Sequence, residues 1–175
     1  MSNTIGNVIA DSLSLGLGYA DRLLTDVSAE TFAHLARPGE NIIESNHGAF
    51  IYGHLTLYAP RIIGELGGDT SAFPITEGDN ALFSKDANCQ HDSDGSIYPP
   101  MHEITDRFKT YYLAAMQQLR ESNDETFSKP NPAGGRLTEL FPTLGSVHAF
   151  YAGGHLMLHM GQMSAWRRMS GLGPA

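Results

Sequence analysis

The sequence predicts an all-α protein built as a four-helix bundle, and three observations support this. Four long segments carry apolar residues at every third or fourth position, strand patterns are weak throughout, and two of the connections are unusually long. The chain has 175 residues, of which 41% are hydrophobic. Such a chain can bury one core without disulfides. We therefore expect residues 1–175 to form a single domain.

The four helical segments are marked by apolar periodicity and by residues that end helices. They are expected at about 4–25, 42–66, 100–122 and 143–169. Pro60 lies inside the second segment and should kink that helix, because proline removes a backbone donor. Gly67 and Gly171 mark the ends of the second and fourth helices. A short additional turn of helix is expected after Ser28, whose hydroxyl could cap it.

The lengths of the connections predict the directions of the helices. Residues 67–99 separate the second helix from the third, and residues 123–142 separate the third from the fourth. A short link joins antiparallel neighbours, whereas a long crossover permits parallel neighbours. We therefore expect the second and third helices to point the same way, which gives an up-down-down-up order.

Charge and cysteine content narrow the class of protein. The formal net charge is −8, which argues against nucleic acid or an anionic membrane as the main partner, because both require a basic surface. The single cysteine, Cys89, cannot form an internal disulfide, and we interpret it as an incidental thiol. The N-terminus also lacks the pattern of a signal peptide. These features lead us to expect a cytoplasmic protein.

One stretch without charged residues is long enough to cross a bilayer. No Asp, Glu, Lys or Arg occurs between Glu139 and Arg167. The stretch nevertheless contains His148, His155 and His159, and three imidazoles would be costly in hydrocarbon. We therefore expect this segment to be the most buried helix of a bundle, hydrophobic nearly all round.

The most informative chemical pattern is a pair of histidines in the fourth helix. His155 and His159 lie four residues apart, so both imidazoles can reach one metal ion from the same helix face. Zinc peptidases with an HExxH motif use this spacing, but Leu156 stands where their catalytic glutamate would be. A zinc peptidase is therefore disfavoured. A di-iron site is also a poor match, because only one Glu-x-x-His string occurs.

Two polar stripes suggest a third ligand. The stripe on the fourth helix contains His148, Ala152, His155, His159, Gln162 and Trp166, and the stripe on the second contains His47, Phe50, His54, Leu57 and Arg61. If these faces meet, His54 completes a three-histidine site suited to zinc, nickel or another late first-row metal. Spacing alone leaves a second interpretation equally open, in which the histidines are hydrogen-bonded core residues.

These residues resemble a known family. The string Tyr52-Gly53-His54-Leu55 in the second helix and the string from Gly154 to Gln162, with its H-x-x-x-H-x-G-Q pattern, are similar to those of the DinB/YfiT-like superfamily of metalloenzymes. The resemblance covers nearly the whole chain. It implies an up-down-down-up bundle, a metal held by three histidines at His54, His155 and His159, and a homodimer. It also implies kinship with transferases and isomerases that use mycothiol, bacillithiol or glutathione.

The leading functional hypothesis is a metal-dependent enzyme with a small-molecule substrate. Its chemistry would be that of a thiol-dependent S-transferase or isomerase, or of a hydrolase. His47, His148, Gln162 and Arg61 are candidates for residues behind the ligands or in the pocket, with Arg61 a candidate for binding a substrate carboxylate. Two alternatives remain open. One is a bundle that binds a metal or small ligand without turnover, and the other is a structural or dimerisation module with core histidines.

Overall fold

The computed structural model describes residues 4–175, and this part of the chain is helical without a β-strand. Its elements are α1 (Ile5–Leu23), α2 (Gly48–Thr56), α3 (Ala59–Glu65), α4 (Glu77–Phe83), α5 (Met101–Glu121), α6 (Asp124–Phe127), α7 (Gly135–Leu140), α8 (Leu144–Ala149), the π-helix η1 (Phe150–His155) and α9 (Leu156–Met169). One isolated antiparallel bridge joins Pro130 to Thr143. The all-α prediction is confirmed.

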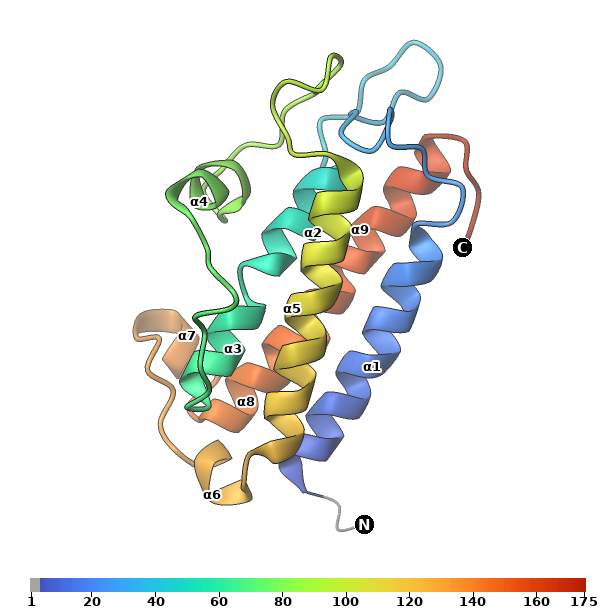
Figure 1. Ribbon diagram of the computed structural model, residues 1–175. Helices are drawn as coiled ribbons and strands as arrows, with labels where there is room; N and C mark the ends of the chain where they lie inside the picture. Colours follow the sequence, from blue (N-terminus) through green and yellow to red (C-terminus); the bar gives the residue numbers. More distant parts are fainter. Residues whose placement is uncertain (1–3) are drawn as a thin grey trace.

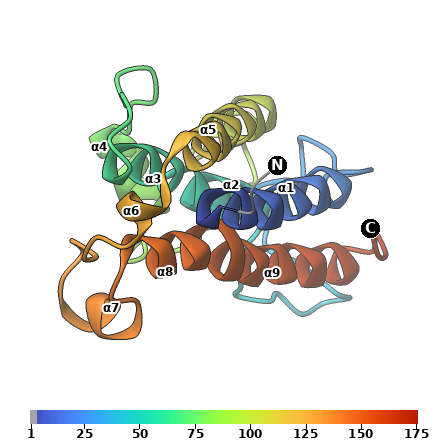
Figure 2. The same cartoon turned by 90° about the horizontal axis from the view of Figure 1, so that it is seen from below.

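The long helices pack side by side around one core. α1 contacts both α5 and α9, while α2 and α3 lie against α5, and α2 also reaches α9. Figure 1 shows α1 and α9 rising toward the upper end and α2, α3 and α5 descending from it. Seen from below, α5 lies on one side and α8 and α9 on the other, with α1 and α2 between them (Figure 2). The sequence placed α1 and α5 within two residues of their observed ends.

The expected second helix is two shorter helices, and this corrects the sequence prediction. α2 begins at Gly48 and not near Ile42, and it ends at Thr56, with α3 starting at Ala59. Pro60 explains the interruption, because a proline ring clashes with the carbonyl four residues earlier, here that of Thr56. The helix is therefore interrupted before the proline, at a place where the sequence predicted only a kink.

The expected fourth helix contains a π-helical turn between α8 and α9. Residues Phe150–His155 form η1, which places one additional residue in a turn. Each such residue rotates the rest of the helix by about 100° relative to a regular α-helix. The expectation of burial nearly all round is also wrong, since Met157 and Leu158 are 42% and 58% exposed. Within residues 4–175, no helix has the combined length and hydropathy needed to cross a bilayer.

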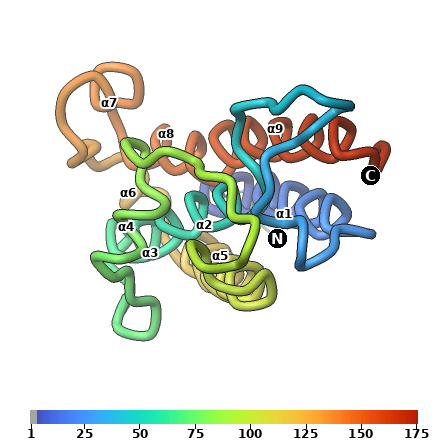
Figure 3. Tube along the Cα trace, turned by 90° about the horizontal axis from the view of Figure 1, so that it is seen from above, coloured from blue at the N-terminus to red at the C-terminus, as the bar shows by residue number. Residues whose placement is uncertain are grey.

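The long connections carry short helices that the sequence analysis did not predict. α4 lies in the connection between α3 and α5, and α6 and α7 lie between α5 and α8. Residues 24–47 and 84–100 run over the upper end of the molecule (Figure 3). After Ser28 the chain forms turns and no helix, although the Ser28 hydroxyl accepts a hydrogen bond from the Thr31 amide at 3.2 Å.

Candidate metal centre

The packing of α2 against α9 brings three histidine side chains to one point. His54 lies in α2, His155 is the last residue of η1, and His159 is one turn further along in α9. The Nε2 atom of His155 lies 3.3 Å from Nε2 of His54 and 3.2 Å from Nε2 of His159. These histidines form a group whose ligand atoms all lie within 4.8 Å of one another and could hold a metal ion.

The separations of the His155 Nε2 atom from the other two Nε2 atoms fit coordination of a single ion. Imidazole nitrogens bind zinc at about 2.1 Å, so two ligands at a tetrahedral angle are about 3.4 Å apart. Ligands at a right angle, as in octahedral or square-planar sites, are about 3.0 Å apart. The observed separations of 3.2 and 3.3 Å lie between these values. The arrangement thus suits several divalent metals and does not select one.

Hydrogen bonds fix the ring orientation of two of the histidines. Nδ1 of His54 donates to the backbone carbonyl of Phe83 at 2.7 Å, and Nδ1 of His159 donates to Oε1 of Gln162 at 2.9 Å. The side-chain amide of Asn46 donates to the same Gln162 oxygen at 3.2 Å. Because carbonyl oxygens only accept, the ring hydrogens lie on Nδ1. The Nε2 lone pairs therefore face the centre, as metal ligation requires.

Among the three histidines of the group, His155 is the one whose ring nitrogens are not all hydrogen-bonded to the described residues. Its Nδ1 atom is buried and has no hydrogen-bond partner within residues 4–175. Its Nε2 atom faces the lone pairs of both neighbours, and a single ring hydrogen there could satisfy only one of them fully. A cation at the point of convergence would satisfy all three Nε2 lone pairs together. The donor set therefore fits a bound divalent metal.

Burial keeps the three imidazoles in the form that binds metals. Desolvation, with added repulsion from His159 and His54, lowers the pKa of His155 to about 3. Desolvation and the nearby His54 lower the pKa of His159 to about 4, and desolvation also lowers the pKa of His54. All three side chains are thus neutral near pH 7, and neutral imidazole is the ligand form.

The histidines open onto a pocket of about 340 Å³. Its other lining residues are Asn46, Phe50, Tyr58, Lys85 and Ala87. The Tyr58 ring lies 4.4 Å from the His155 ring, and the Phe50 ring stacks parallel to that of His54 at 6.1 Å, measured between centroids. Lys85 supplies a cation, and no carboxylate is found among the described residues that line this pocket. The site therefore places three imidazoles, a lysine and an asparagine beside two aromatic rings, in a pocket of the volume that small-molecule sites commonly have.

Gln162 lies next to His159, a candidate ligand, whereas Arg61 and His148 contact Glu65, away from the histidine group. Arg61 donates to Oε1 of Glu65 at 2.8 Å, and His148 contacts Oε2 of the same carboxylate at 2.9 Å. The contacts of Arg61 also include the face of the Tyr151 ring. The π-helical turn explains the separation of His148 from the stripe, because it rotates His155 away from the face that His148 occupies.

His47 has a structural partner at each ring nitrogen. It is the N-cap of α2, where Nδ1 accepts from the Phe50 amide at 3.3 Å, and its Nε2 donates to the carbonyl of Gln90 at 2.8 Å. The ring is fully buried against Tyr98. Both ring nitrogens of His47 are thus hydrogen-bonded to the protein, which explains its burial without a metal ion.

Sequence reasoning missed three contributors to the site. The Phe83 carbonyl belongs to the backbone, which leaves no residue-type signal. Lys85 lies outside the helices in a long connection, where no periodicity shows what it faces. Asn46 fell inside the expected second helix, but α2 begins only at Gly48, so a helical repeat gave no guide to what Asn46 faces.

The fold and site together define an all-α helical protein with a buried group of three histidines that could hold a metal. No protein-family model matches the chain, and no curated protein sequence matches it.

Proposed function

We propose that His54, His155 and His159 bind one divalent metal ion, zinc or nickel, and that the protein is a metal-dependent enzyme acting on a small molecule. The observation that carries this proposal is the convergence of three Nε2 atoms beside a pocket. Two of the rings are already held in the metal-binding tautomer by Phe83 and Gln162. Core histidines that serve only packing have no need of such convergence.

The proposed reaction is thiol-dependent S-transfer or isomerisation, with hydrolysis as the second candidate. A divalent ion with an open coordination position supplies Lewis acidity, which can lower the pKa of a thiol or polarise a carbonyl. The chain's own residues orient the imidazoles, since Phe83 and Gln162 accept from two of the rings. The rings of Phe50 and Tyr58 lie beside the histidines and supply aromatic surface for a substrate.

The arrangement of the helices supports the DinB/YfiT-like resemblance. The directions seen in Figure 1 correspond to the up-down-down-up order of a four-helix bundle, if α2 with α3 and α8 with α9 each count as one helix. We infer this bundle class from that order together with the histidine positions. Homodimer formation stays a prediction from the resemblance.

The pocket supports a substrate that carries an anionic group. Lys85 lies beside the histidines, while Arg61, the residue expected to bind a carboxylate, is engaged by Glu65. The ammonium of Lys85 pairs with Asp86, its exposed neighbour in the chain. Exposed pairs of this kind are weak, so an incoming anion can compete for the lysine. A low-molecular-weight thiol that bears a carboxylate would meet this requirement.

Metal analysis tests the proposal. The wild-type protein is purified without chelator, reloaded with zinc or nickel, and analysed by mass spectrometry beside His155→Ala. His102→Ala is the matched control, because His102 is exposed on α5. We expect one metal per chain in wild type and control and loss of the metal in His155→Ala. A wild-type protein that fails to bind either metal on reloading contradicts the proposal.

Activity screens separate the enzyme from the two alternatives. Metal-loaded protein is assayed with low-molecular-weight thiols paired with electrophiles, and with ester and amide substrates. Metal-dependent turnover that His155→Ala lacks supports the enzyme. Stoichiometric metal without turnover favours a binding bundle. A structural module predicts that replacing all three histidines by glutamine leaves thermal stability unchanged, and that zinc raises the melting temperature of neither protein.

A further inference from the structure

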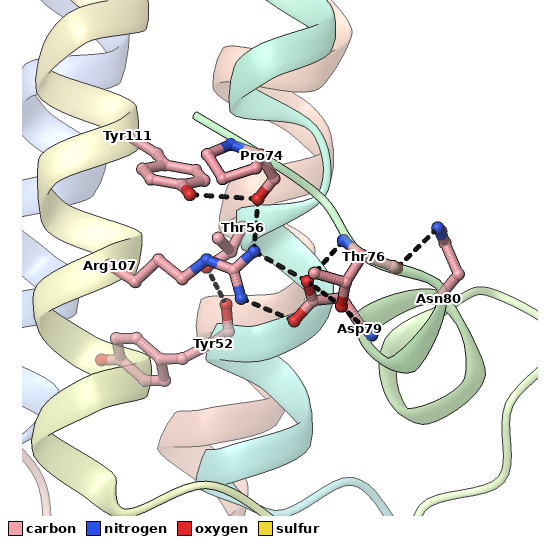
Figure 4. Close-up of polar contacts among 8 residues, drawn as sticks. All are labelled: Tyr52, Thr56, Pro74, Thr76, Asp79, Asn80, Arg107 and Tyr111. Atoms are coloured by element: carbon pink, nitrogen blue, oxygen red, sulfur yellow. Dashed lines mark hydrogen bonds and ion pairs between the residues drawn. The ribbon is translucent and has the colours of Figure 1, made fainter. Parts of the chain in front are cut away.

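A bidentate ion pair links the connection between α3 and α5 to α5 itself. Nη1 of Arg107 lies 2.5 Å from Oδ1 of Asp79, and Nη2 lies 2.8 Å from Oδ2 (Figure 4). Arg107 belongs to α5 and Asp79 to α4. Bidentate pairs of arginine and carboxylate fix geometry as well as distance. The pair therefore ties the first turn of α4, a helix that packs on α2, to α5.

Further hydrogen bonds make this attachment rigid. Nη2 of Arg107 and the hydroxyl of Tyr111 both donate to the carbonyl of Pro74, at 2.6 and 3.1 Å. Oδ2 of Asp79 also accepts from the amide and hydroxyl of Thr76, which completes the capping box of α4 (Figure 4). Arg107 thus holds the start of α4 in two ways. Its guanidinium pairs with the Asp79 carboxylate, and it donates to the Pro74 carbonyl in the segment that leads into α4.

The other end of α4 reaches the histidine group. α4 is seven residues long and spans about 10 Å, so one rigid element links Asp79 to Phe83. The Phe83 ring lies on Gly53, where a Cβ atom would approach it to 2.3 Å. The next residue is His54, whose Nδ1 donates to the Phe83 carbonyl at 2.7 Å. A displacement of α4 along α5 would therefore move the hydrogen-bond acceptor of a candidate ligand.

We propose that Arg107 is a positioning residue for the metal centre, which it serves by holding α4 so that the Phe83 carbonyl fixes the ring of His54. This inference rests on the proposed function, because it takes the three histidines as metal ligands. It adds a residue outside the pocket and on a different helix from every ligand. The groups of a binding site must be held within about 0.5 Å of their productive geometry, so a small shift of α4 that moves the His54 ring would be enough to weaken metal binding.

A matched pair of variants on α5 tests the proposal. Arg107→Gln removes the anchor, whereas Arg120→Gln removes an ion pair from the same helix to Asp11 of α1, away from α4. Zinc affinity is measured by competition with a chromophoric chelator. We expect about a tenfold loss for Arg107→Gln, as for other residues that support metal ligands, and a change within about twofold for Arg120→Gln. Arg107→Lys keeps the positive charge but cannot form the bidentate pair, so its zinc affinity should lie between those of Arg107→Gln and Arg120→Gln.

A second measurement uses the metal-free protein. Nitrogen-15 NMR reports whether the His54 ring carries its hydrogen on Nδ1, and we expect a single Nδ1–H tautomer in wild type and in Arg120→Gln. Arg107→Gln should show a mixture of tautomers. If this variant does not fold, Asp79→Asn takes its place, since its side-chain oxygen can still accept from the Thr76 amide at the start of α4, and the same two changes are expected.

The two measurements separate the inference from the proposed function. Failure of wild type to bind zinc contradicts the proposed function, and the tautomer comparison still decides whether Arg107 positions His54. If wild type binds zinc while Arg107→Gln matches Arg120→Gln in both affinity and tautomer, the positioning role is overturned.

Discussion

Removal of the Gln162 carbonyl should weaken metal binding although all three candidate ligand histidines remain in place in the sequence. Oε1 of Gln162 accepts from Nδ1 of His159 at 2.9 Å and is itself held by Asn46 at 3.2 Å. Gln162→Met keeps a similar side-chain volume but leaves Nδ1–H of His159 without this acceptor. Loss of such a partner typically costs 10- to 100-fold in metal affinity, or about 1.4–2.7 kcal/mol.

We expect the lower end of this range, about tenfold, because Gln162 is neutral and only half-buried. Zinc affinity at neutral pH, measured by chelator competition, checks the value. Gln162→Glu retains an acceptor with a negative charge, so its affinity should equal or exceed that of wild type. Gln117→Met, at an exposed glutamine on α5 that pairs with Glu121, serves as the control. An affinity of Gln162→Met indistinguishable from this control would refute the reasoning.

Three further predictions concern stability and the pocket. Burial lowers the pKa of His47 from its ordinary value of 6.5 to about 4. Between these two pH values His47 is protonated in the unfolded chain but not in the folded chain, so the free energy of unfolding falls as the pH drops from 6.5 toward 4. His47→Asn, which can still cap α2, should reduce the slope of unfolding free energy against pH by up to about 1.4 kcal/mol per pH unit, as urea titrations between these values would show; an unchanged slope argues against this. Lys85→Gln should weaken azide binding to the cobalt-loaded protein about two- to fivefold at low salt, seen in the visible spectrum, and equal affinities would exclude a role for this cation. Gly53→Ala should lower the free energy of unfolding by about 1–3 kcal/mol, because its methyl group meets the Phe83 ring, and a stability equal to wild type in urea unfolding would show that the ring yields freely.

The parts of the fold that were predictable are those where apolar periodicity runs unbroken. α1 and α5 carry regular apolar faces, and the sequence located both closely. The break near Pro60 was expected only as a kink, because the sequence does not show whether neighbouring helices restore the lost backbone contacts. The short helices α4 and α6 begin at side-chain caps, such as the Thr76 capping box of α4, which a search for long periodic segments overlooks.

The same distinction applies to the site. His155 and His159 were predictable because helical spacing alone places them together, and His54 because its face of α2 matched theirs. His148 was grouped with them on the assumption of a regular α-helix, which η1 violates. The Phe83 carbonyl was beyond prediction, because its position depends on how α4 docks on α2 and α5, and docking of this kind is set by long-range packing and by Arg107.

X-ray absorption at the zinc edge tests the central claim most directly, since it reports the atoms bound to the ion without reference to activity. Zinc-loaded wild-type protein should show nitrogen neighbours at about 2.0–2.1 Å, with the outer-shell scattering of three imidazoles. His155→Ala, if any zinc remains, should show fewer imidazoles. A spectrum of the wild-type protein dominated by water, carboxylate or sulfur ligands, with no more than one imidazole, would contradict the assignment of His54, His155 and His159 as the metal centre.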